Sequence, residues 1–162
     1  MVDAESPFDA VAETPLGPIG IRLEGGLVTE ISFTSTDYRV RSPRSAEAEV
    51  AARQIEAYMQ DPAAAFTLPL ALAGTSFQRR VWQALGKIPV GHVRTYGELA
   101  KELSTSPRAV GGACRANPCP IMVPCHRVVA AGGKGGFAGA TSGHWIAIKE
   151  RLLRHEGVVW PR

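Results

Sequence analysis

The sequence lacks the features of a secreted, membrane-spanning or structural zinc protein. It has only three cysteines, Cys114, Cys119 and Cys125, and this odd number argues against a disulfide framework. Their spacing does not match a structural zinc site, so we expect no metal. No apolar run approaches the ~18–20 residues that span a bilayer, and the acidic start lacks the apolar core of a signal peptide. We expect a cytoplasmic protein that does not bind a membrane.

The composition is otherwise ordinary, but the charge is unevenly distributed. The 162 residues are 45% hydrophobic and 20% charged, as in typical globular proteins. Residues 1–74 hold 5 lysines and arginines against 11 acidic residues, and residues 75–162 hold 13 against 4. The two parts therefore carry net charges of −6 and +9. This asymmetry indicates a nucleic acid or another polyanion as partner of the second part, although a solvated basic face without a partner is the alternative.

The acidic part predicts a small antiparallel sheet and one helix. Apolar residues alternate over 19–23 and again over 27–33, and the glycine-rich turn between them predicts a β-hairpin. One face of the second strand would carry Leu27, Thr29, Ile31 and Phe33. Residues 45–60 have an apolar stripe at helical spacing, with Ser45 as N-cap. We place a domain boundary in the stretch that follows, which gives domains of residues 1–74 and 75–162.

The basic part predicts short helices, two of them in a helix-turn-helix pattern. Thr95 and Glu98 have the spacing of a capping box at the start of the first. Ser106 caps the second, with Pro107 at its first position, and this helix runs to about Ala116. Two such helices joined by a polar turn are typical of DNA-binding hairpins, but many helical hairpins bind nothing.

The second of these helices is rich in small residues. They are Ala109, Gly111, Gly112 and Ala113. Two adjacent glycines inside a helix cost about 2 kcal/mol relative to two alanines. The close approach of a bulky object, either another helix or a nucleic-acid backbone, would explain why two glycines stand here despite this cost.

Cys125 and His126 lie together in the apolar, proline-flanked stretch 121–129. A thiol beside an imidazole and the guanidinium of Arg127 can be held as a thiolate, the nucleophilic form. A reactive thiolate where water is scarce suits covalent catalysis. A buried structural cysteine is the alternative, because free cysteines are commonly buried.

Taken together, the segments of the basic part resemble the O6-alkylguanine-DNA alkyltransferases, also called methylated-DNA–protein-cysteine methyltransferases. The matching segments, in the family's order, are residues 77–82, 94–100, 108–113, 117–118, 123–129 and 152–157. The stretch Pro-Cys-His-Arg-Val at 124–128 is highly specific to this family. Residues 1–74 match only weakly, through residues 14–17.

The resemblance implies an α+β fold and a repair function. The N-terminal domain would be ribonuclease H-like, with a small antiparallel sheet and a helix, and the C-terminal domain would be a winged-helix-like DNA-binding domain. The protein would repair O6-alkylguanine, chiefly O6-methylguanine, in double-stranded DNA. A base inside a duplex is unreachable, so it is flipped out of the stack, and its alkyl group passes irreversibly to Cys125. No cofactor is implied. We expect a nucleoid-associated monomer, with cooperative binding on DNA left open.

The resemblance also assigns roles to five catalytic residues. Cys125 would attack the alkyl carbon, and His126 would remove the thiol proton through a bound water. Glu156 would orient the imidazole, in the manner of a catalytic triad. Asn117 would fix the turn before the Cys125 segment. Tyr96 would crowd the phosphate beside the target nucleotide and hydrogen-bond the guanine ring.

Further residues are assigned to DNA and to the substrate pocket. Arg108 would fill the gap left by the flipped base. The other expected DNA contacts are Thr95, Tyr96, Ala109, Gly111, Gly112 and Arg115. The expected substrate-binding residues are Cys125, Val128, Phe137 and Ala138. Phe137 stands where many relatives have tyrosine and Ala138 where some have serine, which leaves the preferred size of the alkyl group open.

Two other functions remain as alternatives. The first is a non-catalytic sensor of alkylated DNA, although relatives of that kind lack the nucleophilic cysteine that this chain has at Cys125. The second is a cysteine-dependent hydrolase, which would turn over repeatedly and ignore DNA. Neither Cys114 nor Cys119 matches a catalytic position, and we interpret both as structural.

Overall fold

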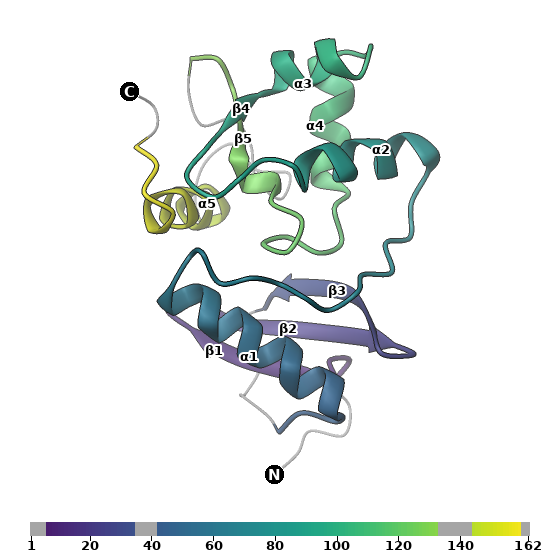
Figure 1. The fold of residues 1–162 in the computed structure, drawn as a ribbon, viewed down its shortest axis with the longest axis vertical. Helices are drawn as coiled ribbons and strands as arrows, with labels where there is room; N and C mark the ends of the chain where they lie inside the picture. Colours follow the sequence, from purple (N-terminus) through teal and green to yellow (C-terminus); the bar gives the residue numbers. More distant parts are fainter. Residues whose placement is uncertain (1–5, 35–41, 133–143, 160–162) are drawn as a thin grey trace. The chain divides into compact units, whose positions relative to one another are not determined.

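The computed structural model describes residues 6–34, 42–132 and 144–159. The chain forms two compact units, residues 1–73 and 74–162 (Figure 1). Phe137 and Ala138, both expected in the substrate pocket, lie outside the described residues. Each unit is described by itself below.

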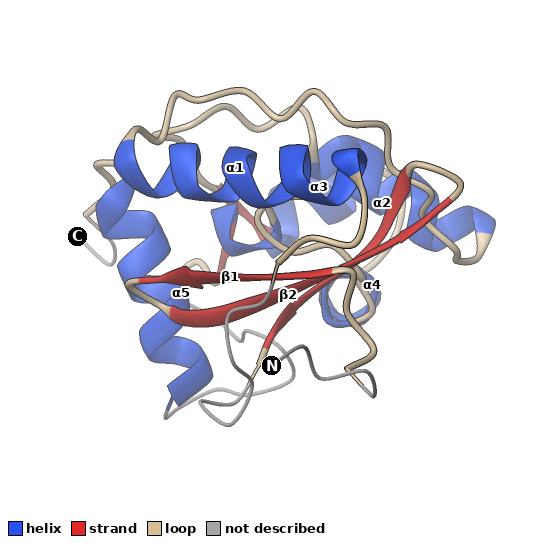
Figure 2. Ribbon diagram, turned by 90° about the horizontal axis from the view of Figure 1, so that it is seen from below, coloured by secondary structure: helices blue, strands red, loops and turns tan. Residues whose placement is uncertain are grey.

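The first unit is a three-stranded antiparallel sheet covered by one helix. The strands are β1 (Ala10–Thr14), β2 (Gly17–Glu24) and β3 (Leu27–Phe33), in the order β1-β2-β3. Helix α1 (Ala46–Gln60) lies along one face of the sheet (Figure 2). As predicted, its N-cap is Ser45, whose hydroxyl accepts a hydrogen bond from the Ala48 amide. The prediction of a mixed fold with a small antiparallel sheet is confirmed.

The prediction that one face of β3 carries Leu27, Thr29, Ile31 and Phe33 is wrong at the first of these residues. Leu27 is 37% exposed, whereas Val28 is fully buried. The cause is a β-bulge, because Arg22 pairs with Glu30 but the next residue of β2 pairs with Val28. The extra residue in β3 reverses which side chains face the core. Strict alternation in the sequence cannot reveal this reversal.

The second unit consists mainly of helices. Its elements are α2 (Ser76–Leu85), β4 (Arg94–Thr95), α3 (Tyr96–Glu102), α4 (Pro107–Arg115), the 3-10 helix η1 (Cys125–Arg127), β5 (Val128–Val129) and α5 (His144–His155). The predicted caps are present. Thr95 and Glu98 form a capping box at α3, and Ser106 caps α4 with Pro107 at its start. A hydrogen bond of 2.9 Å from the Trp82 indole to the Ala113 carbonyl ties α2 to α4.

A short parallel pairing of two strands positions the Cys125 segment. Strand β4 pairs with β5, with Arg94 opposite Val128 and Thr95 opposite Val129. Because α3 begins directly after β4 and η1 ends directly before β5, this pairing brings the start of α3 beside the Cys125 segment (Figure 1).

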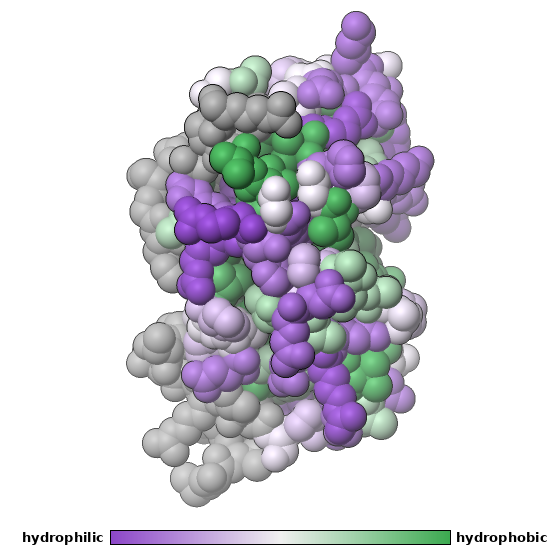
Figure 3. Space-filling view, turned by 60° about the vertical axis from the view of Figure 1, so that its left-hand side comes forward, coloured by the Kyte–Doolittle hydropathy of each residue, from purple (hydrophilic) through white to green (hydrophobic). Residues whose placement is uncertain are grey.

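The surface view in Figure 3 shows mostly hydrophilic side chains with separate hydrophobic patches between them. Among the described residues the exposed large hydrophobic side chains are Leu27, Val50, Val90 and Val159. None of the helices within residues 6–34, 42–132 and 144–159 has the length and apolar composition needed to cross a membrane.

Candidate active site

Cys125 begins η1, directly after Pro124, in a buried position. Residues 123–129 are all buried, and Cys125 itself is 8% exposed. Its amide donates to the Val123 carbonyl at 2.8 Å, which fixes the turn into η1. The sequence therefore places the thiol inside the protein, as its apolar neighbours predict.

A buried ionic cluster adjoins this thiol. The Nε2 atom of His126 lies 2.8 Å from Oε2 of Glu156. Arg127 donates from Nε to Oε1 of the same carboxylate at 2.8 Å, and from Nη2 to Oε2 at 3.0 Å. The side chains of His126 and Glu156 are fully buried, and that of Arg127 is 10% exposed. The fold thus brings together the expected pair of His126 and Glu156. It also places Arg127, whose guanidinium was expected to stabilise a Cys125 thiolate, on the Glu156 carboxylate.

The environment keeps His126 neutral. Burial lowers the pKa of its imidazole, and the charges of Arg127 and Lys149 act in the same direction, against the opposing effect of Glu156. Since the carboxylate can only accept at Nε2, we assign the proton of the neutral ring to that atom. Nδ1 then carries a lone pair, and it is buried without a hydrogen-bond partner among the described residues. A base is thereby available inside the protein.

The expected resting thiolate is not supported. Burial raises the pKa of the Cys125 thiol, and this effect outweighs a hydrogen bond from Asn117 and the charge of Lys149, which lower it. The Arg127 guanidinium cannot supply the expected stabilisation, because it is directed at Glu156 and at the Ile88 carbonyl. Cys125 is therefore a thiol at neutral pH, and its proton has to be removed during a reaction.

Asn117 occupies the turn before the Cys125 segment. Its side-chain amide donates to the Val123 carbonyl at 2.9 Å, and its side-chain oxygen accepts from the Cys119 amide at 2.9 Å. One side chain thus bridges both ends of the loop from 117 to 123. This geometry fits the positioning role that the resemblance implies for it.

Lys149 is a site residue that the sequence reasoning missed. It is fully buried in α5 and donates from Nζ to the Val128 carbonyl at 2.6 Å. Its Nζ lies 5.7 Å from the centre of the Tyr96 ring. Burial lowers the pKa of Lys149 to about 8, opposed by the charges of Cys125 and Cys114. Helical spacing from Trp145 could have revealed it, because position i+4 falls on the buried stripe.

The other two thiols differ in their surroundings. All three cysteines are free. Burial and the charge of Cys125 raise the pKa of Cys114 to about 12, so Cys114 is a poor nucleophile at neutral pH. Cys119 is fully buried. Among the described residues no group of three or more histidines, cysteines or carboxylates is arranged to hold a metal ion.

The resemblance implies that the backbone carbonyls of Cys125 and Val128 accept hydrogen bonds from the guanine amino group. Both carbonyls already accept one hydrogen bond within the protein. The Cys125 carbonyl accepts from the Val128 amide, and the Val128 carbonyl accepts from Lys149. A carbonyl oxygen has two lone pairs, so each can accept a second hydrogen bond. Tyr96, at the first position of α3, is half-buried beside this group.

The expected DNA contacts lie on or near α4. Arg108, Gly111, Gly112 and Arg115 follow the spacing i, i+3, i+4 and i+7, which places them on one helix face. The two arginines are exposed and make no hydrogen bond or ion pair with the described residues. Ala109 is half-buried in the first turn of α4, where its amide donates to Ser106, and Thr95 uses its hydroxyl to cap α3.

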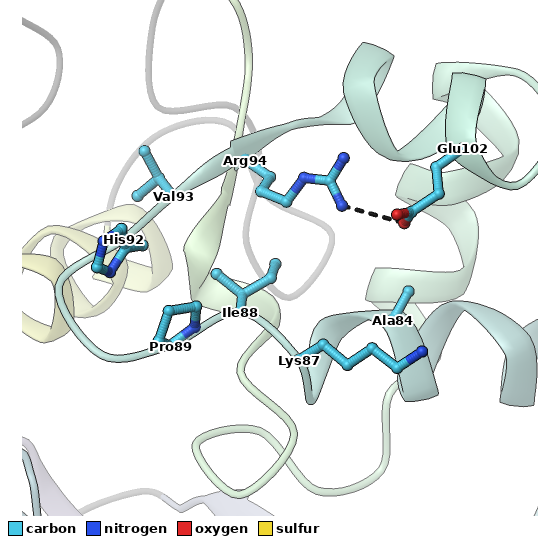
Figure 4. Close-up of a pocket in the computed structure, with 8 residues that line it drawn as sticks. All are labelled: Ala84, Lys87, Ile88, Pro89, His92, Val93, Arg94 and Glu102. Atoms are coloured by element: carbon cyan, nitrogen blue, oxygen red, sulfur yellow. Dashed lines mark hydrogen bonds and ion pairs between the residues drawn. The ribbon is translucent and has the colours of Figure 1, made fainter.

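A separate cavity of about 230 Å³ lies between α2, the following loop and α3 (Figure 4). Its lining residues are Ala84, Lys87, Ile88, Pro89, His92, Val93, Arg94 and Glu102. Arg94 and Glu102 form an ion pair of 3.0 Å across it. The carbonyl of Ile88 accepts a hydrogen bond of 2.6 Å from Nη1 of Arg127, which links this wall to the ionic cluster.

Comparison with known proteins identifies the family. A family model described as the DNA binding domain of 6-O-methylguanine DNA methyltransferase matches residues 76–158. A methylated-DNA–protein-cysteine methyltransferase of Methanosarcina acetivorans is 42% identical over 157 residues, covering 93% of this chain and 98% of that protein.

Solved structures agree with this result. The crystal structure of the Mycobacterium tuberculosis O6-methylguanine methyltransferase is 35% identical, covers 90% of each chain and superposes with a TM-score of 0.77. A Mycobacterium tuberculosis protein crystallised in complex with DNA is also 35% identical, with 90% of each chain covered and a TM-score of 0.70. On this evidence the chain belongs to the methylated-DNA–protein-cysteine methyltransferase family.

Proposed function

We propose that the protein repairs O6-alkylguanine in double-stranded DNA by transferring the alkyl group to Cys125 in a single turnover. The observation that carries this proposal is the buried pair of His126 and Glu156 next to that thiol, with Nδ1 of the imidazole free of any described partner. A buried base beside a buried thiol is an arrangement for generating a thiolate on demand. Family membership supports the same reaction.

The reaction follows from the protonation states. As the sulfur attacks the alkyl carbon, the thiol proton passes through a water molecule to Nδ1 of His126. The sulfur–carbon bond forms while the bond from carbon to O6 breaks, and the departing guanine takes a proton from water onto its ring. The imidazolium then returns the thiol proton to water, so the net reaction moves one proton from the thiol to guanine. Glu156 balances the imidazolium that forms. The product is a thioether, which is not a leaving group, so the protein is consumed.

Lys149 contributes the charge that the thiolate needs. Its ammonium lowers the pKa of Cys125 even though burial keeps that pKa raised in the resting state. A fixed positive charge favours the transition state, in which the sulfur carries negative charge, more than the neutral thiol. The same residue positions the Val128 carbonyl, which would accept from the guanine amino group.

The DNA-binding role rests on α4. Its exposed face combines two arginines with two glycines, and nothing lies within 4 Å of where a Gly112 side chain would begin. The protein's own packing therefore does not require glycine there, and close approach to a DNA backbone is a reason for it. Arg108 would occupy the gap left when the damaged base is flipped toward Cys125. The other contacts would be made by Thr95, Tyr96, Ala109 and Arg115.

One assay tests the proposal against both alternatives. The protein is incubated with a duplex that carries one labelled O6-methylguanine, and its mass is measured before and after. A gain of one methyl group, mapped to Cys125, is the expected result. Cys125→Ser should abolish transfer, whereas Cys119→Ser, the same change at another buried thiol, should leave it intact. Repeated turnover would indicate a hydrolase, and tight binding without transfer would indicate a sensor.

A further inference from the structure

Glu156 accepts more hydrogen bonds than a simple triad requires, and one of its two partners is a cation. Oε1 accepts from Nε of Arg127 at 2.8 Å, and Oε2 accepts from Nη2 of Arg127 at 3.0 Å and from His126 at 2.8 Å. The carboxylate therefore forms a two-point contact with the guanidinium and uses one oxygen for the imidazole as well. Such forked contacts fix the plane of a carboxylate as well as its position.

The guanidinium is itself anchored. Nη1 of Arg127 donates to the Ile88 carbonyl at 2.6 Å, in the loop that follows α2 (the Ile88 side chain is visible in Figure 4). Ile88 is 3% exposed, so this anchor is buried. Three N–H groups of one side chain thus reach two separate segments, the loop after α2 and the turn after α5, which leaves Arg127 little freedom to turn away from Glu156.

The charges around His126 explain why a cation bound to Glu156 helps to keep the imidazole neutral. A buried carboxylate facing an imidazole alone favours proton uptake by the ring, and an imidazolium cannot act as a base. The charged groups that face His126 are Glu156, Arg127 and Lys149. Cys125 directly precedes His126 in the chain. The guanidinium of Arg127 carries a positive charge and pairs with Glu156 at 2.8 Å, so it compensates the charge of the carboxylate.

We propose that Arg127 is a positioning residue for alkyl transfer, which holds both oxygens of Glu156 and keeps His126 a neutral base with Nδ1 ready to accept a proton. This inference rests on the proposed function, because it assigns Arg127 a part in the same proton transfer. It differs from a purely structural role, since it predicts a change in the pH dependence of transfer and not only in its rate.

Two substitutions separate charge from geometry. Arg127→Met removes the compensating charge, so His126 should be protonated at a higher pH. The acidic limb of the pH profile of the single-turnover rate should then move to higher pH by one unit or more. At a pH below this limb the rate should be at least tenfold lower than in the wild type. Arg127→Lys keeps the charge but not the fork. It should leave the limb in place and lower the plateau severalfold, because one ammonium cannot reach both Glu156 oxygens and the Ile88 carbonyl.

The matched control is Arg154→Ala, which removes an exposed charge from the last turn of α5 and should change neither limb nor plateau. An unmoved limb in Arg127→Met with a uniformly lower rate would show a merely structural role and overturn the proposal. Full activity of Arg127→Lys would also overturn it. If Arg127→Met does not fold, Arg127→Lys decides.

A readout independent of transfer keeps this test distinct from that of the proposed function. In protein with ¹⁵N-labelled histidine, NMR of the wild type at pH 7 should show His126 neutral and protonated at Nε2, whereas Arg127→Met should show an imidazolium. A neutral ring in that variant would contradict the inference whether or not the protein repairs DNA. Failure of the wild type to accept a methyl group would instead reject the proposed function.

Discussion

His126 donates from Nε2 to Oε2 of Glu156 at 2.8 Å, with both side chains withdrawn from solvent. These residues are 30 positions apart in the sequence, so the contact depends on α5 packing against η1. Glu156 directly follows the end of α5, two turns after Lys149. This helix and its last turn therefore place the carboxylate on His126 and the ammonium on the Val128 carbonyl.

Glu156→Gln should damage both stability and transfer. The amide is nearly the same shape, but it leaves the buried Arg127 guanidinium without a counter-charge, which costs about 3–5 kcal/mol. Loss of an oriented base should slow transfer by about 10²-fold or more. Urea unfolding and single-turnover transfer from methylated duplex measure the two effects.

The control for this substitution is Glu102→Gln, at an exposed carboxylate that pairs with Arg94 at 3.0 Å. A surface pair contributes at most about 1 kcal/mol, and Glu102 has no part in transfer. Wild-type stability and rate in Glu156→Gln would contradict the assigned role of the carboxylate.

Local signals made much of the helical part predictable. A capping box depends on residues three apart, so Thr95 and Glu98 could be identified from their spacing alone, and Ser106 with Pro107 likewise. The expected adjacency of His126 and Glu156 came from family resemblance, because no local pattern connects two such distant positions.

What could not be predicted depends on three-dimensional context. The bulge in β3 that exposes Leu27 arises from pairing with β2, which the alternation in the sequence does not encode. Helical spacing places Lys149 on the apolar stripe of α5, but only the structure shows that its ammonium is buried and bound to the Val128 carbonyl. At Cys125, burial raises the pKa of the thiol more than the nearby positive charge lowers it, so the expected thiolate is a thiol instead. The sequence cannot show this, because the extent of burial depends on the whole surrounding structure.

Lys149→Met should change how stability depends on pH. Burial lowers the folded-state pKa of Lys149 from 10.5 to about 8, so between these values the unfolded chain binds more protons. The free energy of unfolding of the wild type, relative to the variant, should therefore rise with pH across this window. The full rise is at most about 3 kcal/mol.

Urea unfolding at pH 7 and at pH 9.5 measures this difference, with Lys101→Met, an exposed lysine of α3, as the control that should show no such dependence. Transfer by Lys149→Met should be slow at pH 7, because the thiolate loses its nearest ammonium. A constant stability difference at the two pH values would contradict the burial of a charged Lys149.

Gly112→Ala should stabilise the protein and impair its action on DNA. No atom lies within 4 Å of the added methyl group, and replacing glycine by alanine within a helix gains about 0.5–1 kcal/mol. The same methyl would lie on the face of α4 that we propose approaches DNA. We expect a higher melting temperature together with weaker binding to duplex DNA, measured by fluorescence anisotropy.

The control is Gly86→Ala, at a glycine with helical backbone angles that caps α2, where the added methyl makes only ordinary contacts. It should leave duplex binding unchanged. If Gly112→Ala bound DNA as tightly as the wild type, the close approach of α4 would be refuted.

Arg108→Ala should separate base flipping from chemistry. Arg108 is exposed on α4 and makes no ion pair among the described residues, so its removal should leave stability within about 0.5 kcal/mol of the wild type. Transfer from methylated duplex should slow strongly if, as proposed, Arg108 fills the gap left by a flipped guanine. Transfer from the free base O6-benzylguanine needs no flipping and should be nearly unchanged.

Arg79→Ala, at an exposed arginine of α2, serves as the charge-matched control and should slow neither reaction. Equal slowing of both substrates by Arg108→Ala would place this residue in the chemical step and remove it from base flipping.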